Sequence, residues 1–414
     1  MWRFFARAHW LVTLLVLSTP ASASAPEEGS TLCEAAQQVR LADYAQSVGA
    51  QVESDPVVSR GPFTIAVERL AWQDTSEARL RVVYSAQGLA QFQVEVFRAS
   101  TPDWAEAYTA ACVRVSRRQL QHDNSGQWQA LTIETPAGTL SRPYNPVVPE
   151  TTFAKQPLGP IVGHIDSGVD YRRAEFQRHF LADAKGGWLA RDAWDGDDQP
   201  FDLEIGRSPF FPREHGSRVL DVLLQHTKQV SVIPLRYPRP QMQTLGSHVR
   251  WLIDAGATLI MLPMGSFRSE DWLALEPVIA SSPEVVFVVS AGNNGVDLGV
   301  RPVYPAVFIW PNVLTVTSVL PDGRVAPGSN FGEAVAVGVA AEELTARGID
   351  GVPASVSGSS FAVPIVTAWL AKLQACQPAL KGQFLINALL TSRRQSPDGL
   401  IQGWMDREDP PSCR

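Results

Sequence analysis

The feature that most restricts the fold of this chain is a series of short, continuously apolar segments that begins near residue 160. The expected strands cover residues 161–165, 230–235, 258–262, 285–289, 313–319 and 334–339. Between them lie segments with a helical spacing of apolar residues, at 217–226, 247–255, 271–280 and 361–374. Strands that are apolar on both faces are typical of a parallel sheet with helices on both sides. The pattern predicts a doubly wound α/β domain with a mostly parallel sheet over residues 158–414, including a C-terminal tail.

The earlier part of the chain has a different pattern, which predicts a smaller α+β domain over residues 24–141. A helical spacing of apolar residues covers 31–48, and a second helix is expected at 101–113. Strand-like alternation occurs at 63–70, 78–84, 92–97 and 128–135. A proline-rich stretch (RPYNPVVP) then begins at Arg142 and predicts a linker over residues 142–157.

Residues 1–23 have the pattern of a secretory signal peptide. Arg3 and Arg7 give a basic start, residues 10–17 are apolar, and the small residues 21–23 (ASA) form a cleavage site. The apolar run is too short to span a bilayer, and an uncleaved anchor is the alternative interpretation. No later stretch of the sequence approaches a spanning length. We therefore expect an exported protein, periplasmic or secreted, with no membrane span.

The charge balance argues against nucleic acid as a partner. The 414 residues include 35 Lys and Arg against 42 Asp and Glu, which gives a net charge of −7. A chain without a basic excess gains little from releasing the counterions of a phosphate backbone. Because 45% of the residues are hydrophobic, the chain can bury a sizeable core, and wholesale disorder is excluded.

The cysteines agree with an oxidising compartment. The chain has four of them, Cys33, Cys112, Cys376 and Cys413, and none forms a CxxC pair of the kind that binds zinc. Four cysteines allow three connectivities. We favour Cys33–Cys112 and Cys376–Cys413, because each of these disulfides would join residues near one end of the chain.

Three candidate catalytic residues lie at the boundaries of expected strands and helices. Asp166 follows the first apolar strand, while His215 and Ser360 each precede an expected helix. Taken singly, each has an ordinary explanation: a turn aspartate, a histidine at a helix start and an N-cap serine. Asp, His and Ser in this order at the boundaries of one α/β domain favour a nucleophilic triad instead.

Here the sequence resembles the subtilisin-like serine proteases, or subtilases. Segments 165–170 (IDSGVD), 215–219 (HGSRV) and 358–364 (GSSFAVP) are similar to the family's aspartate, histidine and serine motifs. Segment 289–295 (VSAGNNG) is similar to the part that carries the family's oxyanion-hole asparagine, and weaker likenesses occur at YPA (304–306) and SNFG (329–332). Together the motifs cover about residues 158–395 in the family's order, which makes the resemblance specific.

The resemblance implies a role for each of these residues. Ser360 would be the nucleophile, His215 the general base and then the acid, and Asp166 the group that orients the imidazole. Asn293 would donate its side-chain amide to the oxyanion, beside the backbone N–H of Ser360. The activity implied is that of a serine endopeptidase, which hydrolyses peptide bonds of proteins or peptides through an acyl-enzyme.

The resemblance also implies where substrate backbone binds: Pro263, Met264, Gly265, Ser290, Ala291 and Gly292. Pro263 is a departure, because the family usually has a serine at this position. Proline lacks the backbone N–H but keeps the carbonyl. Binding survives the change if that carbonyl is the group that receives a substrate N–H.

No cofactor is expected for this chemistry, and we expect no metal among the catalytic residues. One acidic cluster has the oxygen ligands that calcium prefers: Asp192, Asp195, Asp197, Asp198 and Asp202. Its spacing differs from that of an EF-hand loop, so structural calcium is a secondary expectation. The default interpretation of the cluster is a solvated turn.

Two questions stay open from the sequence. By resemblance, residues 24–141 could be a propeptide that acts as an intramolecular chaperone and inhibitor, and an accessory docking domain is the alternative. The whole chain could also be a catalytically silent subtilisin-like binding protein. An α/β-hydrolase esterase is excluded, because the serine lacks a GxSxG elbow and the aspartate precedes the histidine and serine.

Overall fold

The structure is a computed structural model that describes residues 24–55, 57–60, 63–124, 128–150, 153–204 and 208–407. The expected signal peptide, residues 1–23, lies outside the described residues. The chain divides into two compact units. The first contains residues 63–117 and 135–137 with the preceding chain up to residue 59, and the second contains residues 118–134 and the chain from residue 138 onward.

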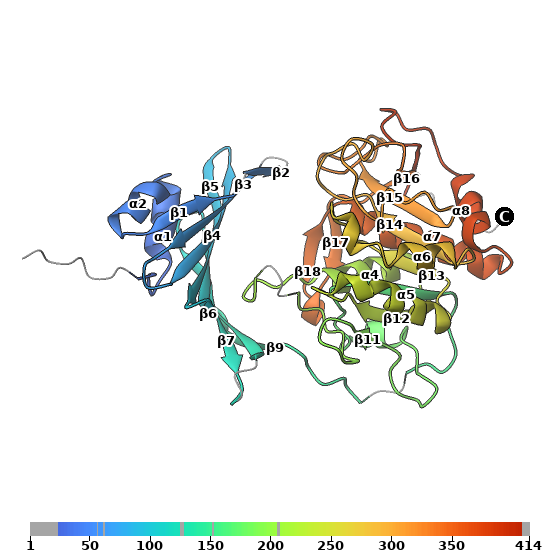
Figure 1. Ribbon diagram of the computed structural model, residues 1–414, viewed down its shortest axis with the longest axis horizontal. Helices are drawn as coiled ribbons and strands as arrows, with labels where there is room; N and C mark the ends of the chain where they lie inside the picture. The colour runs from blue at the N-terminus through green and yellow to red at the C-terminus, as the bar shows by residue number, and fades with distance from the viewer. Residues whose placement is uncertain are drawn as a thin grey trace, which may run out of the picture. The chain divides into compact units, whose positions relative to one another are not determined.

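The second unit is built on a parallel sheet (Figure 1). Its strands follow the order β11-β12-β10-β13-β14-β15-β16-β19, and each pair of neighbours runs parallel. Their bounds are β10 Ile161–Asp166, β11 Arg191–Asp192, β12 Ser231–Arg236, β13 Leu259–Leu262, β14 Val286–Ser290, β15 Val313–Val319, β16 Val337–Ala340 and β19 Trp404–Met405. A separate antiparallel hairpin joins β17 Leu344–Arg347 to β18 Pro353–Val356.

Helices cover both faces of this sheet because successive strand residues are apolar on alternate sides. In β13, Leu259 and Met261 belong to one buried core, and Ile260 and Leu262 belong to the other. The first core also takes residues from α4 His215–His226, α7 Ser359–Cys376 and α8 Gly382–Leu390. The second takes residues from α5 Leu245–Asp254 and α6 Glu276–Ala280. The predicted doubly wound α/β domain is confirmed.

The first unit contains two helices, α1 Ser30–Gln37 and α2 Leu41–Ser47, and the first strands of an antiparallel sheet, whose last strands (most of β7 and β8, and β9) are assigned to the second unit. The strand order of the sheet is β1-β3-β4-β5-β6-β7-β8-β9, and β2 pairs with β3. The bounds are β1 Gln51–Ser54, β2 Val58–Arg60, β3 Phe63–Ala71, β4 Glu77–Ser85, β5 Gly88–Arg98, β6 Thr101–Thr109, β7 Arg114–His122, β8 Trp128–Thr135 and β9 Gly138–Pro143. Leu32 and Ala36 of α1 pack with alternate residues of β4 and β5, such as Leu80 and Val94, so the predicted α+β class is confirmed.

The helix predicted over residues 101–113 is wrong. Thr101–Thr109 is strand β6, which pairs antiparallel with β5. Its Ala and Glu residues favour a helix locally, but Trp104 and Tyr108 point into the core that β5 also lines. Pairing and burial therefore override the local preference.

Two other predicted helices are shorter than expected. The segment 31–48 forms α1 and α2 with a break between them. Val39 lies in this break with a φ of 55°, which is incompatible with a right-handed helix. The segment 271–280 forms only the short helix α6, preceded by a 3₁₀ turn at Ser269–Asp271. None of the helices in the described part of the chain has the length and apolar character of a membrane span.

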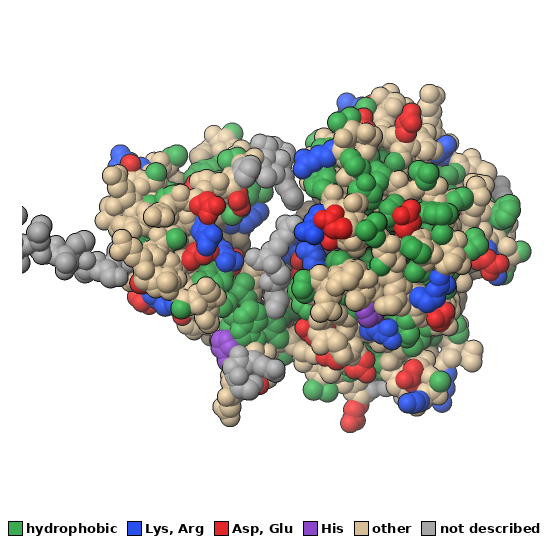
Figure 2. Space-filling model, in the orientation of Figure 1, with side chains coloured by type: hydrophobic (Ala, Val, Ile, Leu, Met, Phe, Trp, Pro, Cys, Tyr) green, Lys and Arg blue, Asp and Glu red, His purple; other side chains and the backbone are tan. Residues whose placement is uncertain are grey.

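Charged side chains of both signs are dispersed over the visible face of the second unit (Figure 2). Several exposed charges of this unit are paired locally, as Arg268 is with Glu270 and Arg324 with Asp322. Such exposed pairs contribute little to stability. The stability of this unit therefore comes from the two apolar cores.

A disulfide links Cys33 of α1 to Cys112, which follows β6, with 5.7 Å between the Cα atoms. It closes a loop across 79 residues of the first unit. This is one of the two pairings predicted from the sequence. The other, Cys376–Cys413, stays a prediction because Cys413 lies outside the described residues.

We expect the Cys33→Ser, Cys112→Ser double variant to lower the free energy of unfolding of the first unit by about 2–4 kcal/mol, because the unfolded loop regains its entropy. Hydrogen–deuterium exchange of the full chain in mild urea measures this, since peptides from β4 and β5 should exchange faster. Peptides from β13 to β15 serve as the internal control and should be unchanged. Unaltered protection of β4 and β5 would contradict the prediction.

Candidate active site

Asp166 is the last residue of β10, at the carboxyl edge of the parallel sheet. Its side chain is buried, and Oδ1 accepts a hydrogen bond of 2.7 Å from the backbone N–H of Ser167. Nδ1 of His215 lies 2.8 Å from Oδ1 and 3.0 Å from Oδ2 of the same carboxylate. A protonated Nδ1 donates to Asp166, which leaves Nε2 of the imidazole free to accept a proton.

His215 reaches Asp166 because α4 starts very close to β10. A Cβ atom on Gly216 would lie 2.0 Å from the carbonyl oxygen of Gly168 and 2.9 Å from Cβ of Asp166. Any side chain at position 216 would therefore push the first turn of α4 away from the strand. The glycine after the histidine is a steric requirement of the Asp–His contact.

The two side chains shift each other's pKa. Burial disfavours the imidazolium, but the charge of Asp166, its hydrogen bond and the charge of Asp202 outweigh burial and raise the pKa of His215. Burial also disfavours the carboxylate, but the charge and the hydrogen bond of His215 outweigh it and lower the pKa of Asp166. The pair thus holds an ionised carboxylate next to an imidazole of increased basicity.

Ser360 lies in the first turn of α7, next to Phe361. Its Oγ donates a 2.9 Å hydrogen bond to the carbonyl oxygen of Pro263, which follows β13. Among the described residues no hydrogen bond joins Ser360 to His215. The ring of Phe361, the next residue, lies 5.5 Å from the imidazole ring, measured between centroids. The structure thus brings the three predicted catalytic residues into one region, with the serine hydroxyl directed to Pro263.

Asn293 follows β14 and is oriented by the residue before Ser360. Its Oδ1 accepts hydrogen bonds from the backbone N–H of Ser359 at 2.9 Å and from the Ser359 hydroxyl at 3.0 Å. Because both bonds go to the oxygen, the amide Nδ2 is left for another acceptor. Gly358 has a φ of 116°, and a Cβ there would lie 2.7 Å from Asn293 Oδ1. The glycine is needed for this approach.

Asn330 is a functional residue that the sequence analysis did not assign. It is buried; its Oδ1 accepts from the backbone N–H groups of Asn294 and Val296, and its Nδ2 donates 2.8 Å to the carbonyl of Ala291. These three bonds fix the loop that carries Asn293. The weak likeness at SNFG (329–332) was the only signal for it in the sequence.

The predicted substrate-binding residues lie in two segments at the same edge of the sheet. Pro263, Met264 and Gly265 follow β13, and Ala291 and Gly292 follow β14, which is the parallel neighbour of β13. Ser290, the last residue of β14, has its Oγ 2.8 Å from the Ser359 hydroxyl. The assignment of these residues to substrate stays a prediction.

The acidic turn is only partly the solvated turn expected by default, because Asp195 and Asp198 are exposed but Asp192 and Asp202 are buried. Arg236 of β12 donates to Asp192 at 2.9 Å and to Asp195 at 2.6 Å, so a guanidinium pairs with two of the five carboxylates. In the described residues no group of three or more His, Cys, Asp or Glu is arranged to hold a metal ion. Structural calcium stays a prediction.

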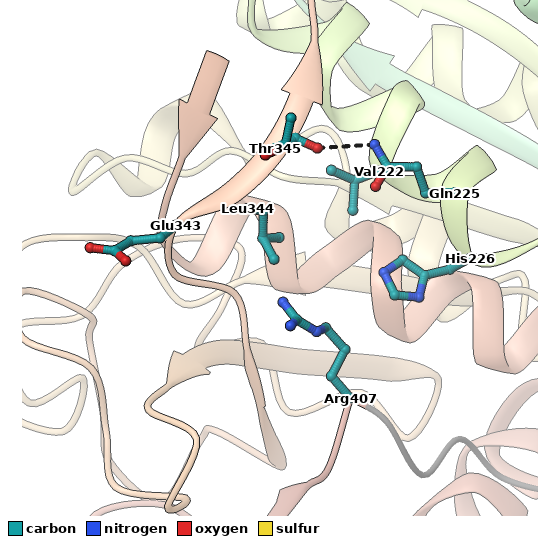
Figure 3. A pocket seen from close by; sticks show the side chains of 7 residues that line it. All are labelled: Val222, Gln225, His226, Glu343, Leu344, Thr345 and Arg407. Carbon is teal, nitrogen blue, oxygen red and sulfur yellow. Dashed lines mark hydrogen bonds between the residues drawn. The ribbon is translucent and has the colours of Figure 1, made fainter. Parts of the chain in front are cut away.

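A pocket of about 350 Å³ lies away from these residues, at the other end of α4. Figure 3 shows it between the end of α4 and the start of β17, where Gln225 donates 3.0 Å to the carbonyl of Thr345. Its remaining lining residues are Val222, His226, Glu343, Leu344 and Arg407. Because His215 is at the opposite end of the helix, this pocket takes no part in the arrangement described above.

The sequence profile of the subtilase family matches residues 225–404, which include Asn293 and Ser360. Comparison with curated proteins gives no match. Among solved structures, the chain is similar to a lanthipeptide protease, with 16% identity, a TM-score of 0.50 and coverage of 60% of this chain and 86% of that chain. It is also similar to a cold-adapted subtilisin-like serine proteinase, with 19% identity, a TM-score of 0.48 and coverage of 64% and 94%.

The structural likeness concerns the fold, and the sequence profile concerns the family. The profile includes β13 and β14 and the segments of Asn293 and Ser360. Asp166 and His215 precede the matched segment, so their assignment rests on the geometry given above. Residues 225–404, somewhat less than half of the chain, are thus similar to the subtilase family.

Proposed function

We propose that the protein is an exported serine endopeptidase that cleaves peptide bonds with Asp166, His215 and Ser360 as its catalytic triad. The observation that carries the proposal is the contact between the buried Asp166 and the half-buried His215, with Nδ1 at 2.8 Å from the carboxylate and the imidazole against Phe361 of α7. The raised pKa of His215 suits a base that would act on a hydroxyl of the first turn of α7.

In the proposed reaction, Ser360 Oγ attacks the carbonyl carbon of the substrate while His215 Nε2 takes the hydroxyl proton. The imidazolium then gives that proton to the amine as the peptide bond breaks, and the acyl-enzyme remains on Ser360. Water then attacks the acyl carbonyl carbon while His215 Nε2 takes one of its protons. The imidazolium returns this proton to Ser360 Oγ as the bond between Ser360 and the acyl group breaks and the acid leaves. Asp166 stabilises the imidazolium at both stages without taking up a proton.

The oxyanion of each tetrahedral intermediate would be bound by Asn293 Nδ2 and the backbone N–H of Ser360. Two features support this assignment. The oxygen of the Asn293 amide is already held by Ser359, which fixes the direction of the Nδ2 group. The N–H of Ser360 lies in the first turn of α7, where backbone donors lack partners within the helix.

Substrate binding would also prepare the nucleophile. In the free protein the Ser360 hydroxyl donates to the Pro263 carbonyl. A substrate N–H that binds this carbonyl would compete with Ser360, and the released hydroxyl could then turn to His215. The proline at this position still provides the acceptor that the proposal needs.

A fluorophosphonate probe tests the nucleophile directly, because Ser360 Oγ would displace fluoride from phosphorus. We expect the wild-type protein to be labelled and Ser360→Ala to be unlabelled. Ser357→Ala is the matched control; this exposed serine only accepts a 2.9 Å bond from the N–H of Glu343 and should leave labelling intact. Labelling of Ser360→Ala, or a folded wild type that the probe does not label, would refute the proposal. The second result would favour a silent binding protein.

Asn293→Ala tests the oxyanion site. We expect kcat on a cleavable peptide to fall about 10²–10³-fold, with KM nearly unchanged, because the amide acts mainly in the transition state. Asn294→Ala is the control, since this neighbour contributes its backbone N–H rather than its side chain to Asn330. Equal kcat values for Asn293→Ala and wild type would show that Asn293 has no such role.

Export and the role of the N-terminal unit belong to the same proposal. The predicted signal peptide and the Cys33–Cys112 disulfide support a protein that folds outside the cytoplasm. We propose that the first unit assists folding and inhibits the enzyme until the chain is cut between about Pro146 and Leu158. Val147 is 85% exposed and Leu158 is 49% exposed, whereas Phe153 between them is buried, so the bonds beside Val147 and Leu158 are the accessible ones.

If the enzyme cuts itself, Ser360→Ala should accumulate as a full-length chain without its signal peptide, while wild type is shorter by the N-terminal unit. Denaturing gels and intact-mass spectrometry of the purified proteins measure this difference. Ser357→Ala should be processed like wild type. Identical masses for wild type and Ser360→Ala would mean that the protein does not process itself.

A further inference from the structure

We infer that Asp202, a carboxylate outside the triad, is a positioning residue that holds the first turn of α4 and thereby the imidazole of His215. This inference rests on the proposed function, because it concerns the same histidine. It assigns a role to one aspartate of the acidic turn that none of the motifs includes. Asp202 comes 13 positions before His215 in the chain, and its side chain is fully buried.

Both oxygens of Asp202 are bound to groups that adjoin the triad. Oδ2 accepts a 2.6 Å hydrogen bond from the backbone N–H of Ser217, and Oδ1 accepts one of 2.6 Å from the Ser167 hydroxyl. The Ser167 oxygen in turn accepts a 3.0 Å bond from the N–H of Gly216. The two N–H groups that follow His215 are therefore held by Asp202, one directly and one through Ser167.

These are N–H groups of the first turn of α4, which lack acceptors within the helix. A carboxylate at this position satisfies them and also interacts favourably with the positive end of the helix dipole. Because His215 is the first residue of α4, fixing this turn fixes the imidazole relative to Asp166. A mobile first turn would spread His215 over several positions and weaken its contact with the carboxylate.

Ser167 also links Asp202 to Asp166. Its hydroxyl lies 2.6 Å from Asp202 Oδ1 and 3.3 Å from Asp166 Oδ1, and it has only one proton to donate. An ionised Asp202 attracts that proton. A protonated Asp202 must itself donate, and the Ser167 oxygen is a direct neighbour, so the Ser167 hydroxyl would turn towards Asp166. The protonation state of Asp202 thus determines whether Asp166, which binds His215, receives a hydrogen bond from the Ser167 hydroxyl.

The charged and titratable groups around this pair come from several elements. Asp166 and the buried His164 belong to β10, Arg213 precedes α4, and Arg236 of β12 donates 2.9 Å to the carbonyl of Leu203. Burial raises the pKa of Asp202 to about 7, against the hydrogen bonds from Ser167 and Ser217. While it is ionised, Asp202 adds its negative charge to that of Asp166 and stabilises the His215 imidazolium.

Asp202→Asn removes this charge and keeps the size of the side chain. We expect the pKa of His215, measured by NMR titration of isotope-labelled histidine, to fall by about one unit, because the imidazolium loses a nearby negative charge. His215 must be neutral to act as a base. The acidic limb of the fluorophosphonate labelling rate should therefore move to lower pH by the same amount, and the plateau rate should fall about tenfold or more.

Asp198→Asn is the matched control, because this aspartate belongs to the same acidic turn but is exposed. It should leave the pKa of His215 and the labelling rate at their wild-type values. A merely structural role of Asp202 would lower the thermal stability of Asp202→Asn without moving the titration of His215. An unshifted His215 in a folded Asp202→Asn protein would overturn the inference.

Ser167→Ala covers the case in which Asp202→Asn does not fold. It keeps the charge of Asp202 but removes the bridge to Gly216, so the plateau rate should fall about fivefold while the acidic limb stays near its wild-type position. A wild-type plateau rate would overturn the positioning role. The NMR titration needs no activity. A wild type that is never labelled would refute the proposed function, and the pKa of His215 would still decide the role of Asp202.

Discussion

The hydrogen bond between the buried Asp166 and the half-buried His215 is the interaction on which the geometry of the site depends. A carboxylate at the end of an interior strand is costly to bury unless its oxygens are satisfied and its charge is balanced. Ser167 and His215 meet these needs at 2.7–2.8 Å, and they keep the pKa of Asp166 low. The same contact makes the imidazole a stronger base. Around it, the fold only has to bring a hydroxyl and an amide donor to the correct edge of the sheet.

The parallel sheet does so with residues that are far apart in the chain. Strands β10, β13 and β14 are successive neighbours, so Asp166, Pro263 and the Asn293 loop meet at one edge. Helix packing then brings in α4 and α7, which start at His215 and Ser359. Glycines at 216 and 358 permit distances that no side chain would allow. The burial of apolar strand faces thus stabilises the fold and offsets the cost of gathering polar groups at the sheet edge.

Much of this could be predicted from the sequence, and the reasons for the failures are physical. Continuous apolar strands follow directly from burial on both faces, so the α/β unit was predictable. Thr101–Thr109 was not, because its pairing with β5 is a long-range contact that composition does not encode. The role of Asp202 was not predictable either, because nothing in the sequence around it indicates hydrogen bonds to Ser167 and Ser217. Asn330 likewise acts only through a loop 34 to 39 residues away.

The most direct test of the account is a crystal structure of the protein after reaction with a fluorophosphonate. We predict phosphorus bonded to Ser360 Oγ, with a phosphoryl oxygen about 2.7–3.1 Å from Asn293 Nδ2 and from the N–H of Ser360. His215 Nδ1 should remain on Asp166, and its Nε2 should face the adduct. Phosphorus on another residue, or a phosphoryl oxygen directed away from Asn293, would contradict the catalytic arrangement proposed for this chain.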